Sequence, residues 1–109
     1  MAYHDTLVAL ADPTRRGLYE RLRRRPHTVG ELARLARITQ PAVSQHLRVL
    51  RDARLVTHDA EGTRRNYRAS REGLAELRSY VERLWDDILA AYASADPAPP
   101  RTTRKRGSR

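Results

Sequence analysis

Apolar residues recur along most of this chain at the three- and four-residue spacing of helices, and the period changes to two after Ala53. The clearest part of the pattern is residues 28–50, where two short helical stretches are separated by Arg37 and Ile38. A connection this short prevents the helices from lying antiparallel, so they must cross steeply, which predicts a helix-turn-helix. The apolar faces are formed by Val29, Leu32, Ala33 and Ala36 in the first helix, and by Val43, Leu47 and Leu50 in the second.

Both of these helices carry start signals. Thr28 and Glu31 have the spacing of a capping box, in which each side chain satisfies a free backbone N–H group. Thr39 is a second N-cap, and Pro41 falls in the first turn, where its missing N–H costs nothing.

The outward face of the second helix is polar without being acidic. With the apolar residues turned to the core, a helical wheel places Pro41, Gln45 and Arg48 directly outward and Gln40, Ala42 and Ser44 beside them. Amide, hydroxyl and guanidinium groups suit the base edges and phosphates of DNA. The alternative is a merely solvated face, which usually carries more Glu and Lys.

Two helices are expected before this motif. Residues 3–11 place Tyr3, Leu7 and Leu10 on one face. A second helix begins with Asp12 as its cap and Pro13 in the first position, and runs to about residue 24 with Leu18 and Leu22 inward. Its arginine-rich end and Pro26 are typical of a helix C-terminus.

After the helix-turn-helix, the strand-like runs 55–60 and 63–68 flank Glu61-Gly62, a hairpin signal weaker than Asn-Gly. Val56 and Tyr67 are the expected inward anchors. The hairpin carries Arg64, Arg65 and Asn66 near its tip. Directly behind a helix-turn-helix, such a hairpin is expected to be a wing that reaches the DNA backbone or minor groove, and the alternative is a plain solvated loop.

A last helix is expected from residue 71, capped by Ser70, to about residue 93. It carries more apolar surface than one face of a small domain can cover, which usually marks an interface. The economical solution is a symmetric dimer, and the alternative is a monomer whose long helix covers its own core. The seam consists of Leu74, Leu77, Val81, Leu84 and Ile88, widened by Tyr80, Trp85, Leu89 and Tyr92. The dimer interface is expected to contain Tyr3, Leu7, Leu77, Tyr80, Val81, Leu84, Trp85 and Ile88.

Composition narrows the class of protein. The chain has 22 basic and 13 acidic residues, a formal charge of +9, which points to a polyanionic partner. It has no apolar run long enough for a membrane span, no secretory signal and no cysteine, so we expect a cytoplasmic protein. Residues 1–94 are expected to form one domain. Residues 95–109 are proline-rich and then basic, and are expected to be a disordered tail that either adds phosphate binding or has no function.

These motifs together resemble the ArsR family of bacterial winged-helix transcriptional regulators. The resemblance covers about residues 4–93 and is carried by residues 9–16, 29–33 and 40–47, with Leu50, Leu55-Val56, Glu61-Gly62 and Arg65-Asn66-Tyr67 behind them. It implies a mainly α-helical winged helix-turn-helix of four helices, two strands and a fifth helix. It further implies a homodimeric repressor of an inverted-repeat operator, associated with the nucleoid through that operator. The expected DNA-binding residues are Thr39, Gln40, Pro41, Ala42, Ser44, Gln45, His46, Arg48, Arg64, Arg65 and Asn66.

The chain departs from the metal-sensing members of that family. Their sites use paired cysteines, or histidines with carboxylates on the last helix, whereas His4, His27, His46 and His58 are scattered and none lies there. Glu82, Asp86 and Asp87 of the last helix could suggest a cation site with oxygen ligands. Because Arg78 and Arg83 lie nearby, we expect ordinary helix ion pairs instead. We therefore expect no metal and no cofactor.

Other function classes receive less support. An enzyme would need a nucleophile with a partner base, a phosphate-binding glycine loop or a metal motif, and none is present. An interaction module that has lost DNA binding would show acidic residues on the outward face of residues 40–48, and there are none. A ligand sensor with a pocket near Trp85, Tyr80 and Tyr92 is compatible with DNA binding, and the effector would be a small molecule or a protein.

Overall fold

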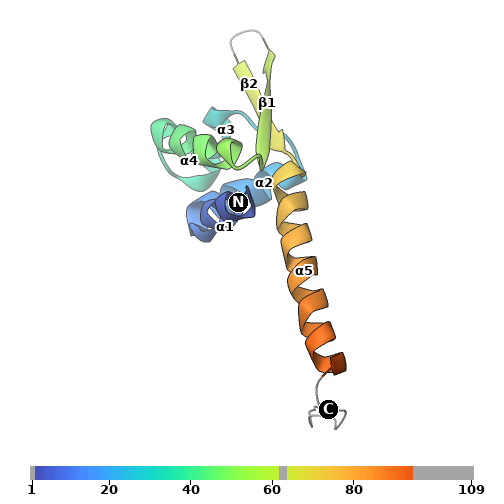
Figure 1. Ribbon diagram of the computed structural model, residues 1–109. Helices are drawn as coiled ribbons and strands as arrows, with labels where there is room; N and C mark the ends of the chain where they lie inside the picture. Colours follow the sequence, from blue (N-terminus) through green and yellow to red (C-terminus); the bar gives the residue numbers. More distant parts are fainter. Residues whose placement is uncertain (1, 62–63, 95–109) are drawn as a thin grey trace. The chain divides into compact units, whose positions relative to one another are not determined.

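The computed structural model describes residues 2–61 and 64–94. Figure 1 shows helices α1 to α4 gathered beside a two-stranded hairpin, which is the predicted mainly helical winged fold. The elements are α1 (Ala2–Ala11), α2 (Pro13–Arg24), α3 (Val29–Ala36), α4 (Gln40–Asp52), β1 (Val56–Glu61), β2 (Arg64–Ala69) and α5 (Glu72–Ser94). The expected tail and Gly62 of the expected turn lie outside the described residues.

The chain divides into two compact units, residues 1–79 and residues 80–109. The first contains α1 to α4, the hairpin and the start of α5. The second, as far as the structure describes it, is the remainder of α5 from Tyr80 to Ser94. Within the described residues, no helix has both the length and the apolar character that a membrane span requires.

The core of the first unit contains the residues that the apolar periodicity predicted. The confirmed inward residues are Leu18, Leu22, Leu32, Ala33, Val43, Leu47, Leu50, Val56 and Tyr67. Val29, Ala36 and Leu10 pack against this core while partly exposed. The fully buried residues of α1 are Thr6 and Ala9, which lie beside the predicted apolar face, whereas Leu7 remains 46% exposed.

The junction of α1 and α2 closes two helix ends at once. The carboxylate of Asp12 accepts the N–H of Arg15 at 2.9 Å and caps α2, as predicted. Arg15 Nε in turn donates to the carbonyl of Ala9 at 2.9 Å, and Arg16 Nη1 donates to that of Leu10 at 2.8 Å. These carbonyls belong to the last turn of α1, which lacks basic residues of its own, so the two arginines act as its C-terminal cap.

The predicted caps of α3 and α4 are confirmed. Thr28 Oγ1 accepts the N–H of Glu31 at 3.2 Å, while Glu31 Oε1 accepts the N–H of Thr28 at 3.0 Å. Thr39 Oγ1 accepts the N–H of Ala42 at 3.2 Å at the start of α4. Between the helices, Arg37 adopts the left-handed conformation with φ of 60°, which reverses the chain after α3.

The predicted position of the hairpin turn was wrong. Glu61 is the last residue of β1 and pairs with Arg64, so both strands begin and end one residue later than expected. The predicted turn would have paired Val56 with Tyr67, whereas the structure pairs Val56 with Ala69 and His58 with Tyr67. A register shift of two residues leaves each side chain on the same face, which explains why the inward anchors were nevertheless correct.

Strand β2 is held from both edges. Its Tyr67 pairs with His58 of β1 on one side and forms an isolated bridge with His27 on the other. The bridge has two hydrogen bonds, 3.0 Å from the His27 N–H and 2.8 Å from the Tyr67 N–H. The hairpin is therefore attached directly to the α2–α3 connection.

The first turn of α5 lies close against the backbone that follows α4. Gly73 is buried, and its N–H donates to the carbonyl of Arg54 at 2.9 Å. Thr6 Oγ1 donates to the Gly73 carbonyl at 3.2 Å. A Cβ atom on Gly73 would lie 2.4 Å from the carbonyl oxygen of Ala53, so only glycine fits where α1, α4 and α5 meet. Ser70 Oγ accepts the N–H of Glu72 at 3.3 Å, and α5 begins at Glu72, one residue later than expected.

Candidate nucleic-acid interface

The outward face of α4 has the orientation that the helical wheel predicted. Side chains at the start and along one side of the helix are exposed, namely Thr39, Gln40, Pro41, Ser44, Gln45 and Arg48. Ala42 and His46 are half-buried at the edges of this face. The face contains no acidic residue, so it presents donors, acceptors and positive charge to any partner.

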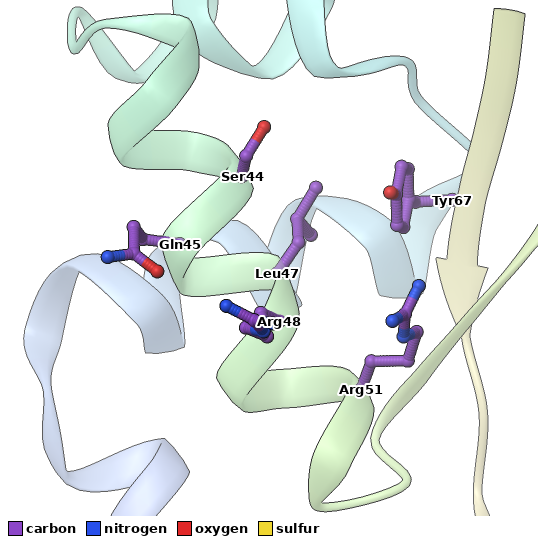
Figure 2. Close-up of a pocket in the computed structure, with 6 residues that line it drawn as sticks. All are labelled: Ser44, Gln45, Leu47, Arg48, Arg51 and Tyr67. Atoms are coloured by element: carbon purple, nitrogen blue, oxygen red, sulfur yellow. The ribbon is translucent and has the colours of Figure 1, made fainter.

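A polar groove separates α4 from β2. It has a volume of about 320 Å³ and is lined by Ser44, Gln45, Leu47, Arg48, Arg51 and Tyr67. Figure 2 shows Gln45 and Arg48 projecting from α4 and Tyr67 projecting from β2 toward the same helix. Two hydroxyls, an amide and two guanidinium groups line this groove, a combination that can contact phosphates and base edges together.

Arg51 is a residue of this groove that the sequence reasoning missed. Its Nη1 lies 3.0 Å from Nε2 of His58 on β1. Because a guanidinium only donates, Nε2 must accept and the ring hydrogen sits on Nδ1, which is buried without a partner among the described residues. The signal was present in the sequence: Ser44, Arg48 and Arg51 follow one another at spacings of four and three.

The hairpin places further cations near its tip. Arg64 and Arg65 are exposed and Asn66 is half-buried. Arg68, two residues further along β2, forms an ion pair with Asp59 of β1 across the hairpin. The two arginines nearest the tip are therefore the cations that the hairpin presents to solvent, in keeping with the expected wing.

The residues expected at a dimer interface are exposed or half-buried in both units. In the first unit, Leu7 of α1 is exposed, and Tyr3 and Leu77 are half-buried. In the second unit, Tyr80 is half-buried, and the exposed fractions are 51% for Val81, 44% for Leu84, 62% for Trp85 and 51% for Ile88. Within the described residues, the apolar seam of α5 is thus exposed from Val81 onward, whereas Leu74 packs against the core of the first unit.

His27 and His58 have local structural contacts. His27 is 4% exposed and its Nδ1 lies 2.9 Å from the carbonyl of Arg25. His58 is bound to Arg51, and its ring centroid lies 5.1 Å from that of Tyr67. In the part of the chain that the structure describes, no three His, Cys, Asp or Glu residues are grouped as a metal ion would need.

Comparisons with known proteins agree with this geometry. A family model described as "Helix-turn-helix domain" matches residues 10–59. The chain is 53% identical over 85 residues to the HTH-type transcriptional regulator Rv2034 of Mycobacterium tuberculosis, covering 78% of this chain and 79% of that protein. It is 37% identical over 73 residues to the HTH-type transcriptional repressor SmtB of the same species, covering 67% of this chain and 54% of the repressor.

A solved structure extends the likeness to the fold. The ArsR-like transcriptional regulator from Rhodococcus sp. RHA1 superimposes with a TM-score of 0.75 at 28% identity. The alignment covers 89% of this chain and 95% of that one.

Proposed function

The chain belongs to the ArsR family of winged helix-turn-helix transcriptional regulators, which bind DNA, and from this premise we propose that it is a repressor that binds an inverted-repeat operator as a homodimer. The observation that supports the proposal best is the exposed face of α4 beside the groove to β2. It combines hydrogen-bonding side chains with two arginines and lacks acidic residues.

We assign base reading to the amides of this face. Gln40 and Gln45 are exposed, and an amide can donate and accept in a bidentate contact with adenine. Arg48 and Ser44 contact phosphates or bases, and Arg51 joins them because it lines the same groove. Thr39, Pro41, Ala42 and His46 shape the edges of the face, and Arg64, Arg65 and Asn66 of the hairpin reach the flanking backbone or minor groove.

We propose that a second copy of the chain covers the apolar seam of α5. Val81, Leu84, Trp85 and Ile88 fall at helical spacing and are all exposed, and exposed apolar patches of this kind mark interfaces. A two-fold interface is self-complementary, so one helical face serves both subunits. Two recognition helices related by such an axis match an inverted repeat whose half-sites lie one turn, about 34 Å, or a multiple apart.

We propose that the regulator belongs to the members of the family that do not sense metals, because it has no cysteine to supply a thiolate. Derepression would then depend on a small molecule or a protein effector. Because the relatives of this chain are named as transcriptional regulators, we propose no catalytic activity for it. Since operators lie in the nucleoid, we place the protein in the bacterial cytoplasm.

The proposal is tested by measuring binding and assembly on the same sample. Fluorescence anisotropy with the inverted repeat upstream of its own gene should give tight binding, with two subunits per duplex. Sedimentation at micromolar concentration should show a dimer. Leu84→Asp would bury an unpaired charge in the seam, and we expect it to give monomers that lose operator binding. Ser79→Asp, which adds the same single charge at an exposed position on the opposite face of α5, is the matched control.

A monomeric wild type that binds a single half-site as tightly as the full repeat would contradict the homodimer. Absence of sequence preference in the wild type would instead contradict the assignment of base reading to α4.

A further inference from the structure

A second cationic pocket lies in the first unit, beside the end of α2. It has a volume of about 290 Å³ and is lined by Arg21, Arg24, Arg25, His27 and Leu35. It shares no residue with the groove between α4 and β2. We infer that this pocket binds a phosphate group, supplied either by the DNA backbone outside the recognised half-site or by a free phosphorylated molecule.

Two arginines of the pocket, Arg21 and Arg25, bind backbone carbonyls, and Arg25 also interacts electrostatically with the carboxylate of Glu31. Arg21 Nη2 donates to the carbonyl of Leu35 at 3.3 Å, and Arg25 Nη1 donates to that of Pro26 at 3.2 Å. Within the described residues, none of the three takes part in an ion pair. The C-terminus of α2 stabilises some of this positive charge, but three guanidinium groups around one cavity still repel one another, and a phosphate would relieve that repulsion.

Backbone contacts hold parts of this pocket. Arg21 and Arg25 each use one N–H in an exposed hydrogen bond to a carbonyl, which leaves further N–H donors for a ligand. His27 forms a rigid wall, because its backbone pairs with Tyr67 and its ring is anchored to the carbonyl of Arg25. A guanidinium can donate two parallel hydrogen bonds to the oxygens of a phosphate, a geometry that a monatomic solvent anion cannot match.

The pocket faces a different direction from the recognition helix. On α3, a Cβ atom at Gly30 would lie 3.7 Å from the amide nitrogen of Gln40, so that side of α3 faces the start of α4. Leu35 is five residues later, about 140° further around the helix. The pocket therefore supplies phosphate-binding chemistry in addition to the groove rather than as part of it.

Neighbouring arginines of α2 provide a matched pair of variants. Arg24 lines the pocket, and no hydrogen bond or ion pair holds it among the described residues. Arg23 does not line the pocket and is paired with Glu20 at 2.5 Å. Arg24→Gln and Arg23→Gln remove the same charge one residue apart, so a difference between them reports the pocket and not the net charge.

Two measurements distinguish the sources of phosphate. In the first, inorganic pyrophosphate is titrated into the DNA-free protein by calorimetry; a free phosphorylated ligand predicts saturable binding that weakens about 10-fold in Arg24→Gln and is retained in Arg23→Gln. In the second, anisotropy compares a minimal operator duplex with one extended on both sides. A backbone phosphate predicts that Arg24→Gln loses about threefold in affinity on the extended duplex only, with a salt slope smaller by about one.

Equal behaviour of the two variants in both measurements would overturn the inference. A wild-type protein that does not bind the operator would contradict the proposed function. Pyrophosphate binding that is weakened in Arg24→Gln and retained in Arg23→Gln would still support the pocket in that case. The two ideas therefore fail separately.

Discussion

Gln45 is the side chain on which sequence preference should depend most. It is exposed on α4, lines the groove and carries no charge, so its contribution to non-specific binding is small. We expect Gln45→Ala to cost about 1–3 kcal/mol on the cognate operator and little on random DNA. Anisotropy on both duplexes at one salt concentration measures the difference. An equal loss on both would give Gln45 a positioning role.

Gly73 illustrates a residue whose importance is steric. Any Cβ there would meet the carbonyl of Ala53 at 2.4 Å, and a backbone atom cannot move aside cheaply. We expect Gly73→Ala to lower the free energy of unfolding by about 2–3 kcal/mol. Gly17 of α2 has nothing within 4 Å of its would-be Cβ, so Gly17→Ala should stabilise by about 0.5–1 kcal/mol. Denaturant unfolding of both variants checks the contrast, and equal effects would contradict it.

Sequence patterns identified residues whose roles are set by local periodicity, and missed those set by distant contacts. The exposed positions of α4 followed from 3.6-residue spacing alone. Thr6 was missed because its partner, Gly73, is 67 residues away in the chain. Arg51 was missed although its helical spacing from Arg48 was visible, because its contact with His58 of the following strand could not be read from α4 alone.

At the scale of the element, helix starts were predictable and helix ends less so. An N-cap needs one side chain within three residues, so Asp12, Thr28 and Thr39 announced α2, α3 and α4. The C-terminus of α1 is closed by Arg15 and Arg16 from the next helix, which no pattern inside α1 could show. The hairpin turn was displaced because Glu61-Gly62 is a weak signal and strand pairing decides the register.

The caps make stability sensitive to acid. The N–H of Thr28 lowers the pKa of Glu31 below its usual 4.5, and the N–H of Arg15 lowers the pKa of Asp12 below its usual 3.8. The unfolded chain therefore takes up these protons first, so the stabilisation is present above the unfolded pKa values and is lost as pH falls through the folded ones. We expect the melting temperature of Glu31→Gln to fall less than that of the wild type between about pH 5 and pH 3.

Glu76→Gln is the control for that measurement, because Glu76 pairs with Arg54 on the surface and caps no helix. If both variants follow the wild type through the acid range, the capping carboxylate does not control acid stability.

The hairpin should act on all DNA alike. Arg64 and Arg65 are exposed near its tip, where arginines meet phosphates rather than base edges. We expect the double variant Arg64→Ala, Arg65→Ala to weaken binding to operator and random duplexes by similar factors and to reduce the salt slope by about one or two. A loss confined to the operator would mean that the wing reads sequence.

At the scale of the whole molecule, the elements and the fold could be predicted from the sequence. The assembly could not, because it depends on contacts with a second molecule. The seam of α5 was recognised from spacing, and the exposed Leu84, Trp85 and Ile88 agree with it. What covers that seam is a matter of intermolecular packing, so the homodimer stays a proposal that sedimentation decides.

The composition of the whole chain also bears on whether metal ions or oxidants regulate operator binding. Soft-metal sensors need thiolates and redox sensors need a reactive cysteine, and this sequence contains no cysteine. His27 and His58 already bind a backbone carbonyl and Arg51. We therefore expect operator affinity to change by less than about 0.5 kcal/mol on addition of chelator, zinc or mild peroxide.

Titration of zinc into the protein–operator complex decides this directly. Release at a stoichiometric amount of metal would mean that histidines and carboxylates of two subunits assemble a site that one chain does not show, and the His4→Gln or His46→Gln variant should then abolish it. Release of the operator only by a large excess of zinc would reflect non-specific competition for DNA phosphates. In that case the same excess of zinc should also release Gln45→Ala from random DNA. Unchanged affinity throughout leaves an organic ligand or a protein effector as the signal to which this repressor would respond.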